Sequence, residues 1–269
     1  MTIIQAIFLG AVQGVAEFLP ISSSGHLAVA EYFLGHTDIP IIFDILLHIA
    51  TLGAVCIVFY KQIWRLLTVL GRFIIRKNTV EDNADLKLIS ALLISTAVTG
   101  LIGIVLKDAV QAKNILFIAV CFIITGIVLL LSAKLHPKKD VSVPSVLQAV
   151  IIGAAQGIGV LPGISRSGST IAAALLTGVS REKAGEYSFL LSIPAILAAF
   201  IFELKSADTI SGSIGAAALI AGMLTAFIVG FFALTFLLKL IRKGKLGLFA
   251  YYLIPAGIIL FGAVGIFQL

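Results

Sequence analysis

Residues 13–25 read QGVAEFLPISSSG, and residues 156–168 read QGIGVLPGISRSG. The two stretches align without a gap, with residue 13 on residue 156, so their glutamines, isoleucines, outer serines and final glycines coincide. They differ in their ionisable side chains. The first has Glu17, followed by His26 just after the stretch, whereas the second has Arg166. Two copies of one scaffold, one with an acid and an imidazole and the other with a guanidinium, indicate a single site built from both halves of the chain.

The composition around these stretches is that of a membrane protein. Of the 269 residues, 60% are hydrophobic and only 12% are charged, and the mean hydropathy is +1.15. A soluble domain of this size cannot hide so much apolar surface, so we predict an all-α polytopic membrane protein. Apolar runs near the length of a bilayer crossing, about 20 residues, recur along the chain. They predict six spans, at about 41–60, 88–106, 114–134, 184–203, 213–238 and 247–267.

The net charge of +6 has a distribution that argues against binding to nucleic acid. Lysine and arginine gather in four short segments, at 61–87, 134–139, 181–183 and 239–245. All four fall on one side of the membrane in the six-span arrangement. Short cytoplasmic loops carry such an excess of positive charge, so these segments are predicted to face the cytoplasm. The amphipathic run at 63–77 can lie along the anionic inner leaflet.

The two copies are predicted to enter the membrane from opposite sides. Each half of the chain, about 1–134 and about 144–269, has one copy followed by three spans, and an odd number of crossings reverses the side of entry. Within each copy, an apolar helix stops at a Ser/Gly/Pro loop and a shorter apolar helix follows. These pieces are too short to cross, so they predict re-entrant hairpins whose loops meet near the bilayer midplane. The predicted helices are 3–19 with 27–34, and 146–161 with 170–176. The whole chain of residues 1–269 is predicted to form a single membrane domain.

Polar side chains gather at the predicted loop tips. Gln13 and Glu17 are four residues apart, which places them on one face of a helix. Serine is a preferred N-cap, and the exposed N–H groups of a helix start favour an anion. Arg166 can donate two N–H bonds to a phosphate and cannot lose its charge. The residues predicted to help bind such an anion are Gln13, Ser22, Ser24, Ser165, Ser167 and Ser169, with Ser23 beside them.

Structural roles compete with this interpretation. Glu17 and Arg166 can form an ion pair that only locks the two hairpins together. Capping and close helix packing also explain the tip serines without any ligand. Asp44 and His48 lie one turn apart in the first full span, where charged residues are rare. They either line the same cavity or satisfy each other, and we favour the second.

Common motifs of soluble enzymes are missing from the sequence. The nearest match to GxSxG is GISRSG at 163–168, which has Ser167 where glycine is required. The chain also has no Walker A lysine motif and no Cys/His spacing typical of zinc. The polar loop tips are therefore the candidate site.

The two stretches resemble the signature motifs of the undecaprenyl-diphosphatase family of the bacitracin-resistance type. The family's first motif is Glu or Gln, three residues, Glu, and then a proline–serine loop and His, which Gln13, Glu17 and His26 match. The second motif, Pro-Gly-variable-Ser-Arg-Ser-Gly, matches 162–168, and the stretch 186–199 is also similar to a family segment. The resemblance covers the whole chain in length and span order.

The resemblance implies hydrolysis of undecaprenyl diphosphate to undecaprenyl phosphate and inorganic phosphate. This reaction recycles the lipid carrier for peptidoglycan and cell-wall synthesis and confers resistance to bacitracin. The resemblance also implies a divalent metal, Mg²⁺ or Ca²⁺, and an active site open to the outer face of the bacterial cytoplasmic (inner) membrane. The expected partners are the lipid substrate and the membrane lipids, and a homodimer is left open.

The tip residues suit this chemistry. Arg166 and the two helix starts would hold phosphate oxygens, and Glu17 helped by Gln13 would bind the metal, because Mg²⁺ takes few carboxylates alongside phosphate oxygens and waters. We favour Ser23 and His26 acting together as nucleophile and base. Attack by His26 itself, or by water activated by Glu17 or His26, stays open. The competing function is a secondary transporter or a lipid-phosphate flippase, because broken helices that meet at the midplane also build transporters.

Overall fold

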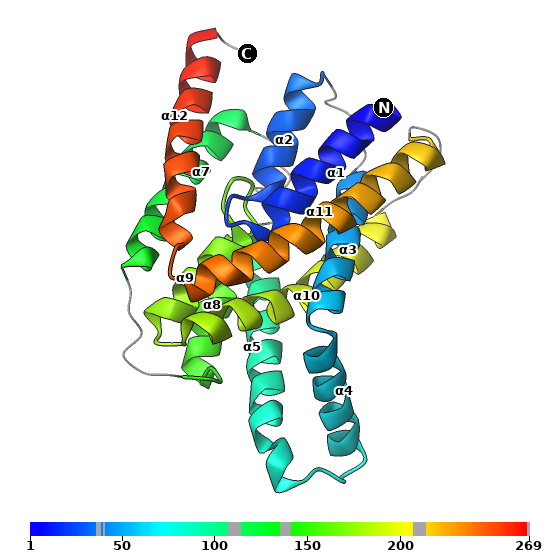
Figure 1. Cartoon of the computed structure of the whole chain (residues 1–269), viewed down its shortest axis with the longest axis vertical. Coiled ribbons are helices and arrows are strands. Elements are labelled where there is room, and N and C mark those ends of the chain that lie inside the picture. The colour runs from blue at the N-terminus through cyan, green and yellow to red at the C-terminus, as the bar shows by residue number, and fades with distance from the viewer. Residues whose placement is uncertain (36–38, 40, 107–113, 135–140, 207–213, 268–269) are drawn as a thin grey trace.

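The computed structural model is an all-helical bundle, which confirms the predicted polytopic membrane fold (Figure 1). It describes residues 1–35, 39, 41–106, 114–134, 141–206 and 214–267. In chain order the helices are α1 (Ile3–Phe18), α2 (Ser23–Phe33), α3 (Ile41–Val58), α4 (Tyr60–Ile74), η1 (Val80–Asp82), α5 (Asn83–Val105), α7 (Ile115–Ala133), α8 (Val146–Ile158), α9 (Arg166–Leu176), α10 (Arg181–Ser206), α11 (Ala216–Arg242), η2 (Leu246–Phe249) and α12 (Ala250–Phe267).

Five of the six predicted spans are confirmed among the described residues. The segments long and apolar enough to cross a membrane are Val80–Val105, Ile115–Ala133, Arg181–Phe202, Ala216–Arg242 and Leu246–Val264. Residue 213, the predicted start of the fifth span, lies outside the described residues. The predicted span 41–60 is wrong in one respect. It is interrupted after Val58, where the chain bends by 84° between α3 and α4, so only the bent pair together counts as a sixth span.

The amphipathic run predicted at 63–77 corresponds to α4, which packs against α5. Leu66 and Val69 are buried on its inner face. The Arg65 guanidinium donates two hydrogen bonds, of 2.5 and 2.6 Å, to the Asp85 carboxylate at the start of α5. These contacts attach α4 to α5. The contact of α4 with the inner leaflet stays a prediction.

Each repeated stretch lies in a hairpin made of a short helix, a loop and a second short helix. The Ser22 side chain caps α2 by accepting a hydrogen bond from the Gly25 N–H, and the Ser165 side chain caps α9 by accepting one of 3.0 Å from the Gly168 N–H. Because these serines are N-caps, both second helices begin four residues before the apolar segments predicted at 27–34 and 170–176.

Glycines at matched positions three residues before the two stretches allow close helix contacts. A Cβ atom on Gly10 would lie 3.0 Å from the carbonyl carbon of Gly222 in α11. One on Gly153, the matched residue, would lie 2.6 Å from the carbonyl oxygen of Ser95 in α5. So α1 packs along α11 in the way that α8 packs along α5, as Figure 1 shows for the first pair. A duplicated scaffold would pack in this way, although the boundaries of the two halves stay a prediction.

The α8–α5 contact gives a stability prediction. Gly153→Ala is expected to lower the free energy of unfolding by about 1–3 kcal/mol, because the added methyl group must push α8 away from the α5 backbone. Gly100→Ala in α5 is the control, since a Cβ there meets nothing within 4 Å and alanine favours the helix. Reversible unfolding of both variants in detergent measures the difference. Equal losses in the two variants would contradict this account of the contact.

Candidate functional site

The two hairpin loops meet at Glu17, in the last turn of α1. The Glu17 side chain is only 3% exposed, and its Oε1 accepts a hydrogen bond from Nη2 of Arg166, the first residue of α9. The loops are also joined through Ser22, whose Oγ accepts a hydrogen bond of 3.1 Å from the Gly163 N–H. The structure therefore brings the expected carboxylate and guanidinium together from the two repeated stretches.

The other oxygen of Glu17 collects three more polar contacts. Glu17 Oε2 accepts hydrogen bonds from Gln13 Nε2 at 3.1 Å and from Ser23 Oγ at 2.7 Å. His48 Nε2 lies 3.3 Å from the same oxygen. A buried charge is costly unless it is paired and hydrogen-bonded, and this carboxylate is surrounded by such partners. The arrangement holds Glu17 in one position at the meeting point of the loops.

His48 belongs to this site, contrary to the preferred sequence interpretation. The interpretation favoured from the sequence is mutual pairing of the Asp44 and His48 side chains. In the structure, His48 Nδ1 lies 2.7 Å from the backbone carbonyl oxygen of Asp44, and Nε2 lies beside Glu17. Asp44 therefore contacts the imidazole of His48 through its backbone carbonyl and not through its carboxylate. The other ring nitrogen, Nε2, is free to contact Glu17 in the hairpin.

Ser23 and His26 do not form the expected pair in this structure. The Ser23 hydroxyl donates to Glu17, so the base beside it is a carboxylate. His26 Nδ1 lies 2.8 Å from the carbonyl oxygen of Ser22, and its ring stacks on Phe122 of α7 with centroids 4.7 Å apart. The separation has a local cause: the first turn of α2 points Ser23 back to α1, while His26 faces α7 and α12.

His26 has a second partner that the sequence did not reveal. Its Nε2 lies 2.8 Å from the hydroxyl oxygen of Tyr252 in α12, which is 226 residues away along the chain. Tyr252 lies in an apolar span beside another tyrosine, and no repeat or spacing distinguishes it. Only the packing of α12 near the hairpin identifies it as a neighbour of the site.

The remaining tip serines fall into two groups. Those that hold the loops are Ser22 and Ser165, which cap the helices, and Ser167, whose hydroxyl donates to the Phe18 carbonyl at 3.1 Å. Ser24 and Ser169 are half-buried in the first turns of α2 and α9. Ser22 has a φ of +73°, which is uncommon for a residue other than glycine. The structure thus gives the capping serines a role in shaping the site.

The site has a sparse set of candidate metal ligands. Among the described residues, no group of three His, Cys, Asp or Glu side chains is placed to hold a metal ion. Within this part of the chain, Oε1 of Gln13 is buried without a hydrogen-bond partner, although its Nε2 bonds to Glu17. One carboxylate and one amide oxygen fit Mg²⁺ or Ca²⁺ only if phosphate oxygens and waters complete the coordination.

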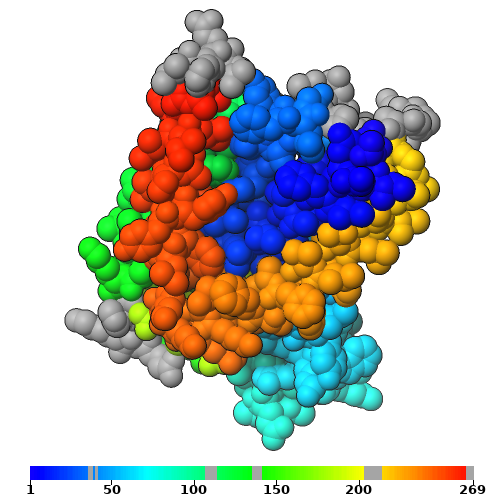
Figure 2. All heavy atoms as spheres, turned by 45° about the horizontal axis from the view of Figure 1, so that its top comes forward, coloured from blue at the N-terminus to red at the C-terminus, as the bar shows by residue number. Residues whose placement is uncertain are grey.

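An apolar groove of about 640 Å³ leads to His26. It lies between α1, α11 and the η2–α12 segment, and its lining includes Val12, Leu19, Leu240 and Phe249. His26 and Tyr252 are its polar residues. Figure 2 shows α1 beside α11, with α12 on the same face of the molecule. The groove is therefore a route by which an apolar chain can reach His26 and the first hairpin loop.

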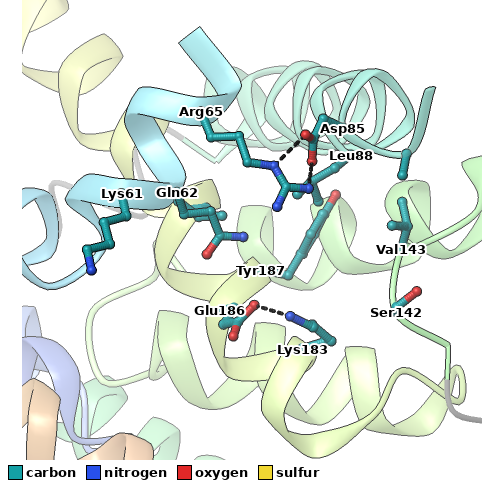
Figure 3. A pocket seen from close by; sticks show the side chains of 12 residues that line it. Lys61, Gln62, Arg65, Asp85, Leu88, Ser142, Val143, Lys183, Glu186 and Tyr187 are labelled. Atoms are coloured by element: carbon teal, nitrogen blue, oxygen red, sulfur yellow. Dashed lines mark hydrogen bonds and ion pairs between the residues drawn. The ribbon is translucent and has the colours of Figure 1, made fainter. Parts of the chain in front are cut away.

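A second cavity, of about 430 Å³, lies between α4, α5 and α10 (Figure 3). Two of the cationic side chains that line it form ion pairs within the chain: Arg65 with Asp85, and Lys183 with Glu186 at 2.8 Å. Sequence reasoning did not identify this cavity. Its charged pairs link α4 to α5 and brace the start of α10, so we do not assign the reaction to it.

Comparison with known proteins covers both hairpins. Residues 6–259 match the sequence model of a family described as "Bacitracin resistance protein BacA". The chain is 61% identical, over 96% of each sequence, to a Treponema denticola protein named undecaprenyl-diphosphatase. It is 40% identical to a Desulforapulum autotrophicum protein of that name, over 96% of this chain and 97% of the relative. A relative from Methanosphaera stadtmanae with the same name is 39% identical over the same shares.

Proposed function

This chain belongs to the bacitracin resistance protein BacA family, and on that premise we propose that it hydrolyses undecaprenyl diphosphate to undecaprenyl phosphate and inorganic phosphate. The observation that carries the proposal is the buried Glu17–Arg166 pair in a hairpin whose His26 lines an apolar groove. A lipid diphosphate has the matching halves, an anionic head and a long apolar tail. The reaction recycles the lipid carrier for cell-wall synthesis, and it confers bacitracin resistance by removing the diphosphate that the drug binds.

The head group is held by positive charge and by helix starts. Phosphoryl transfer depends mainly on positioning and on stabilising the charge of the transferred group. Arg166 supplies guanidinium donors, and the N-terminal ends of α2 and α9 point their first turns toward the loop contact. Ser24 and Ser169 lie in these turns and can add hydroxyl donors to the phosphate oxygens.

Ser23 is the favoured nucleophile. Its Oγ attacks the terminal phosphorus, the bond from that phosphorus to the bridging oxygen breaks, and undecaprenyl phosphate leaves. The hydroxyl proton passes to Glu17, which already accepts a hydrogen bond from Ser23 at 2.7 Å. Water then cleaves the phosphoserine to give inorganic phosphate and to restore the hydroxyl. Attack by His26, or by water activated at Glu17 or His26, is the alternative first step.

Glu17 and Gln13 are the residues that would hold a divalent metal in this proposal. Gln13 donates its Nε2 to the Glu17 carboxylate and has a buried Oε1 without a hydrogen-bond partner, which supports this assignment. When bound, Mg²⁺ or Ca²⁺ would neutralise charge on the phosphate oxygens. The protein residues orient the head group and move the proton between Ser23 and Glu17.

We place the protein in the bacterial cytoplasmic membrane with the site open to the outer face. The α4–α5 connection lies within one of the basic segments that sequence charge assigns to the cytoplasm. The α1–α2 hairpin enters the bundle from the opposite end, where the N-terminus and the last turns of α12 lie (Figure 1). The hairpin that carries Glu17, Ser23 and His26 is therefore the outer one.

Phosphate release in detergent separates this function from transport. Purified protein in micelles, with no membrane compartments, is expected to release inorganic phosphate from undecaprenyl diphosphate over many turnovers. A transporter or flippase would bind the same head group with the same residues and would release none. Multiple turnovers by wild type, lost in the Glu17→Gln variant, support hydrolysis. Binding of the lipid without any phosphate release would overturn the proposal.

A further inference from the structure

His26 has only one ring nitrogen available for chemistry. Nδ1 lies 2.8 Å from the Ser22 carbonyl oxygen, which can only accept, so Nδ1 carries a proton and donates. In the neutral imidazole the lone pair is therefore on Nε2, where the Tyr252 hydroxyl donates to it at 2.8 Å. Stacking on Phe122 keeps the ring in this orientation. The reactive nitrogen of His26 is thus capped by Tyr252.

Tyr252 also lines the apolar groove, together with His26. Tyr252 is 49% exposed, in contrast to the buried Phe122 that stacks on the imidazole. Because α1 and Tyr252 line the groove together, an apolar tail that lies in it and reaches His26 passes between them. The residue that caps Nε2 is therefore also a residue that a tail contacts.

We propose that Tyr252 determines specificity for lipid-linked diphosphates by coupling occupation of the groove to release of His26 Nε2. An isoprenoid tail in the groove displaces the Tyr252 ring and breaks the hydrogen bond to Nε2. The freed nitrogen then faces the phosphate head group. A diphosphate without a tail leaves Tyr252 in place and meets a capped nitrogen. The role of the tail rests on the proposed function, whereas the cap itself is a feature of the structure.

The strength of the Tyr252–His26 hydrogen bond sets how much uncapping changes the population of free Nε2. One hydrogen bond of this kind contributes about 1 kcal/mol, which corresponds to about a fivefold change in the fraction of uncapped imidazole. A tail can displace the Tyr252 ring, because each methylene group that it buries favours its binding by about fourfold. Tyr252 therefore acts as a positioning residue that works through His26.

The test uses protein labelled with ¹⁵N-histidine in micelles, in which the Nε2 resonance of His26 reports its hydrogen bond. The resonance is assigned from its loss in His26→Asn. Tyr252→Phe removes the hydroxyl and keeps the ring, so it is expected to move the resonance to the uncapped position. Tyr251→Phe is the matched control, because Tyr251 is 75% exposed and is not part of the groove lining. It should leave the resonance at the wild-type position.

The second arm adds tail and head separately to wild-type protein and needs no variant. Undecaprenol, which has the tail and no phosphate, is expected to move the Nε2 resonance of His26 toward the position that it has in Tyr252→Phe. Inorganic phosphate, which has no tail, is expected not to do so. An unmoved resonance with undecaprenol, or equal effects of Tyr252→Phe and Tyr251→Phe, would overturn the proposal. Because neither arm measures turnover, its failure is distinct from a failure of the proposed hydrolysis.

Discussion

Glu17→Gln is expected to lower kcat/KM for undecaprenyl diphosphate by about a thousandfold, within the range that general base catalysis contributes. The substitution keeps the shape of the side chain but removes its charge. Ser23 then loses its proton acceptor, and Arg166 is left without the carboxylate that fixes its position. Steady-state phosphate release at saturating and at low substrate gives kcat and KM separately, and we expect most of the loss in kcat.

A control for this prediction is Glu186→Gln. Glu186 is another glutamate in an ion pair, with Lys183 at 2.8 Å, but it is only partly buried and lines the second cavity. Its replacement should change kcat/KM by less than about twofold, because such a partly exposed pair contributes little. If the two glutamine variants kept similar activity, Glu17 would have only a structural role.

Arg166→Lys is expected to lower kcat/KM by about a hundredfold, the usual loss when one donor to a developing charge is removed. Lysine keeps the positive charge but loses the planar fork that can hold phosphate oxygens and Glu17 together. Arg242→Lys is the matched control. Arg242 pairs with Glu182 at 2.7 Å on the surface and is 61% exposed, so activity should be retained. Full activity of Arg166→Lys would show that charge alone is sufficient at this position.

The repeated sequence predicted the framework of the site because backbone contacts impose the same residues twice. Gly10 and Gly153 allow matching helix contacts, and Ser22 and Ser165 cap matching helices. Such residues are fixed by local geometry, so a comparison within one chain finds them. The meeting of Glu17 and Arg166 followed from that framework, because a buried charge needs a partner.

The residues that the sequence did not place are brought in by tertiary packing. His48 approaches Glu17 because α3 packs beside α1, and its spacing from Asp44 suggested a local pair instead. Tyr252 approaches His26 from α12, which no motif links to the hairpin. The bend after Val58 was also unexpected, because apolar composition alone does not show where a span is interrupted.

A double-mutant cycle on Glu17 and Arg166 is the most direct test of a single site made from both hairpins. We would measure kcat/KM for undecaprenyl diphosphate with wild type, Glu17→Gln, Arg166→Lys and the double variant. Residues that act as one unit are strongly non-additive, so the double variant should be no slower than Glu17→Gln alone, about a thousandfold below wild type. Losses that multiply, to about a hundred-thousandfold, would mean that the two residues act independently.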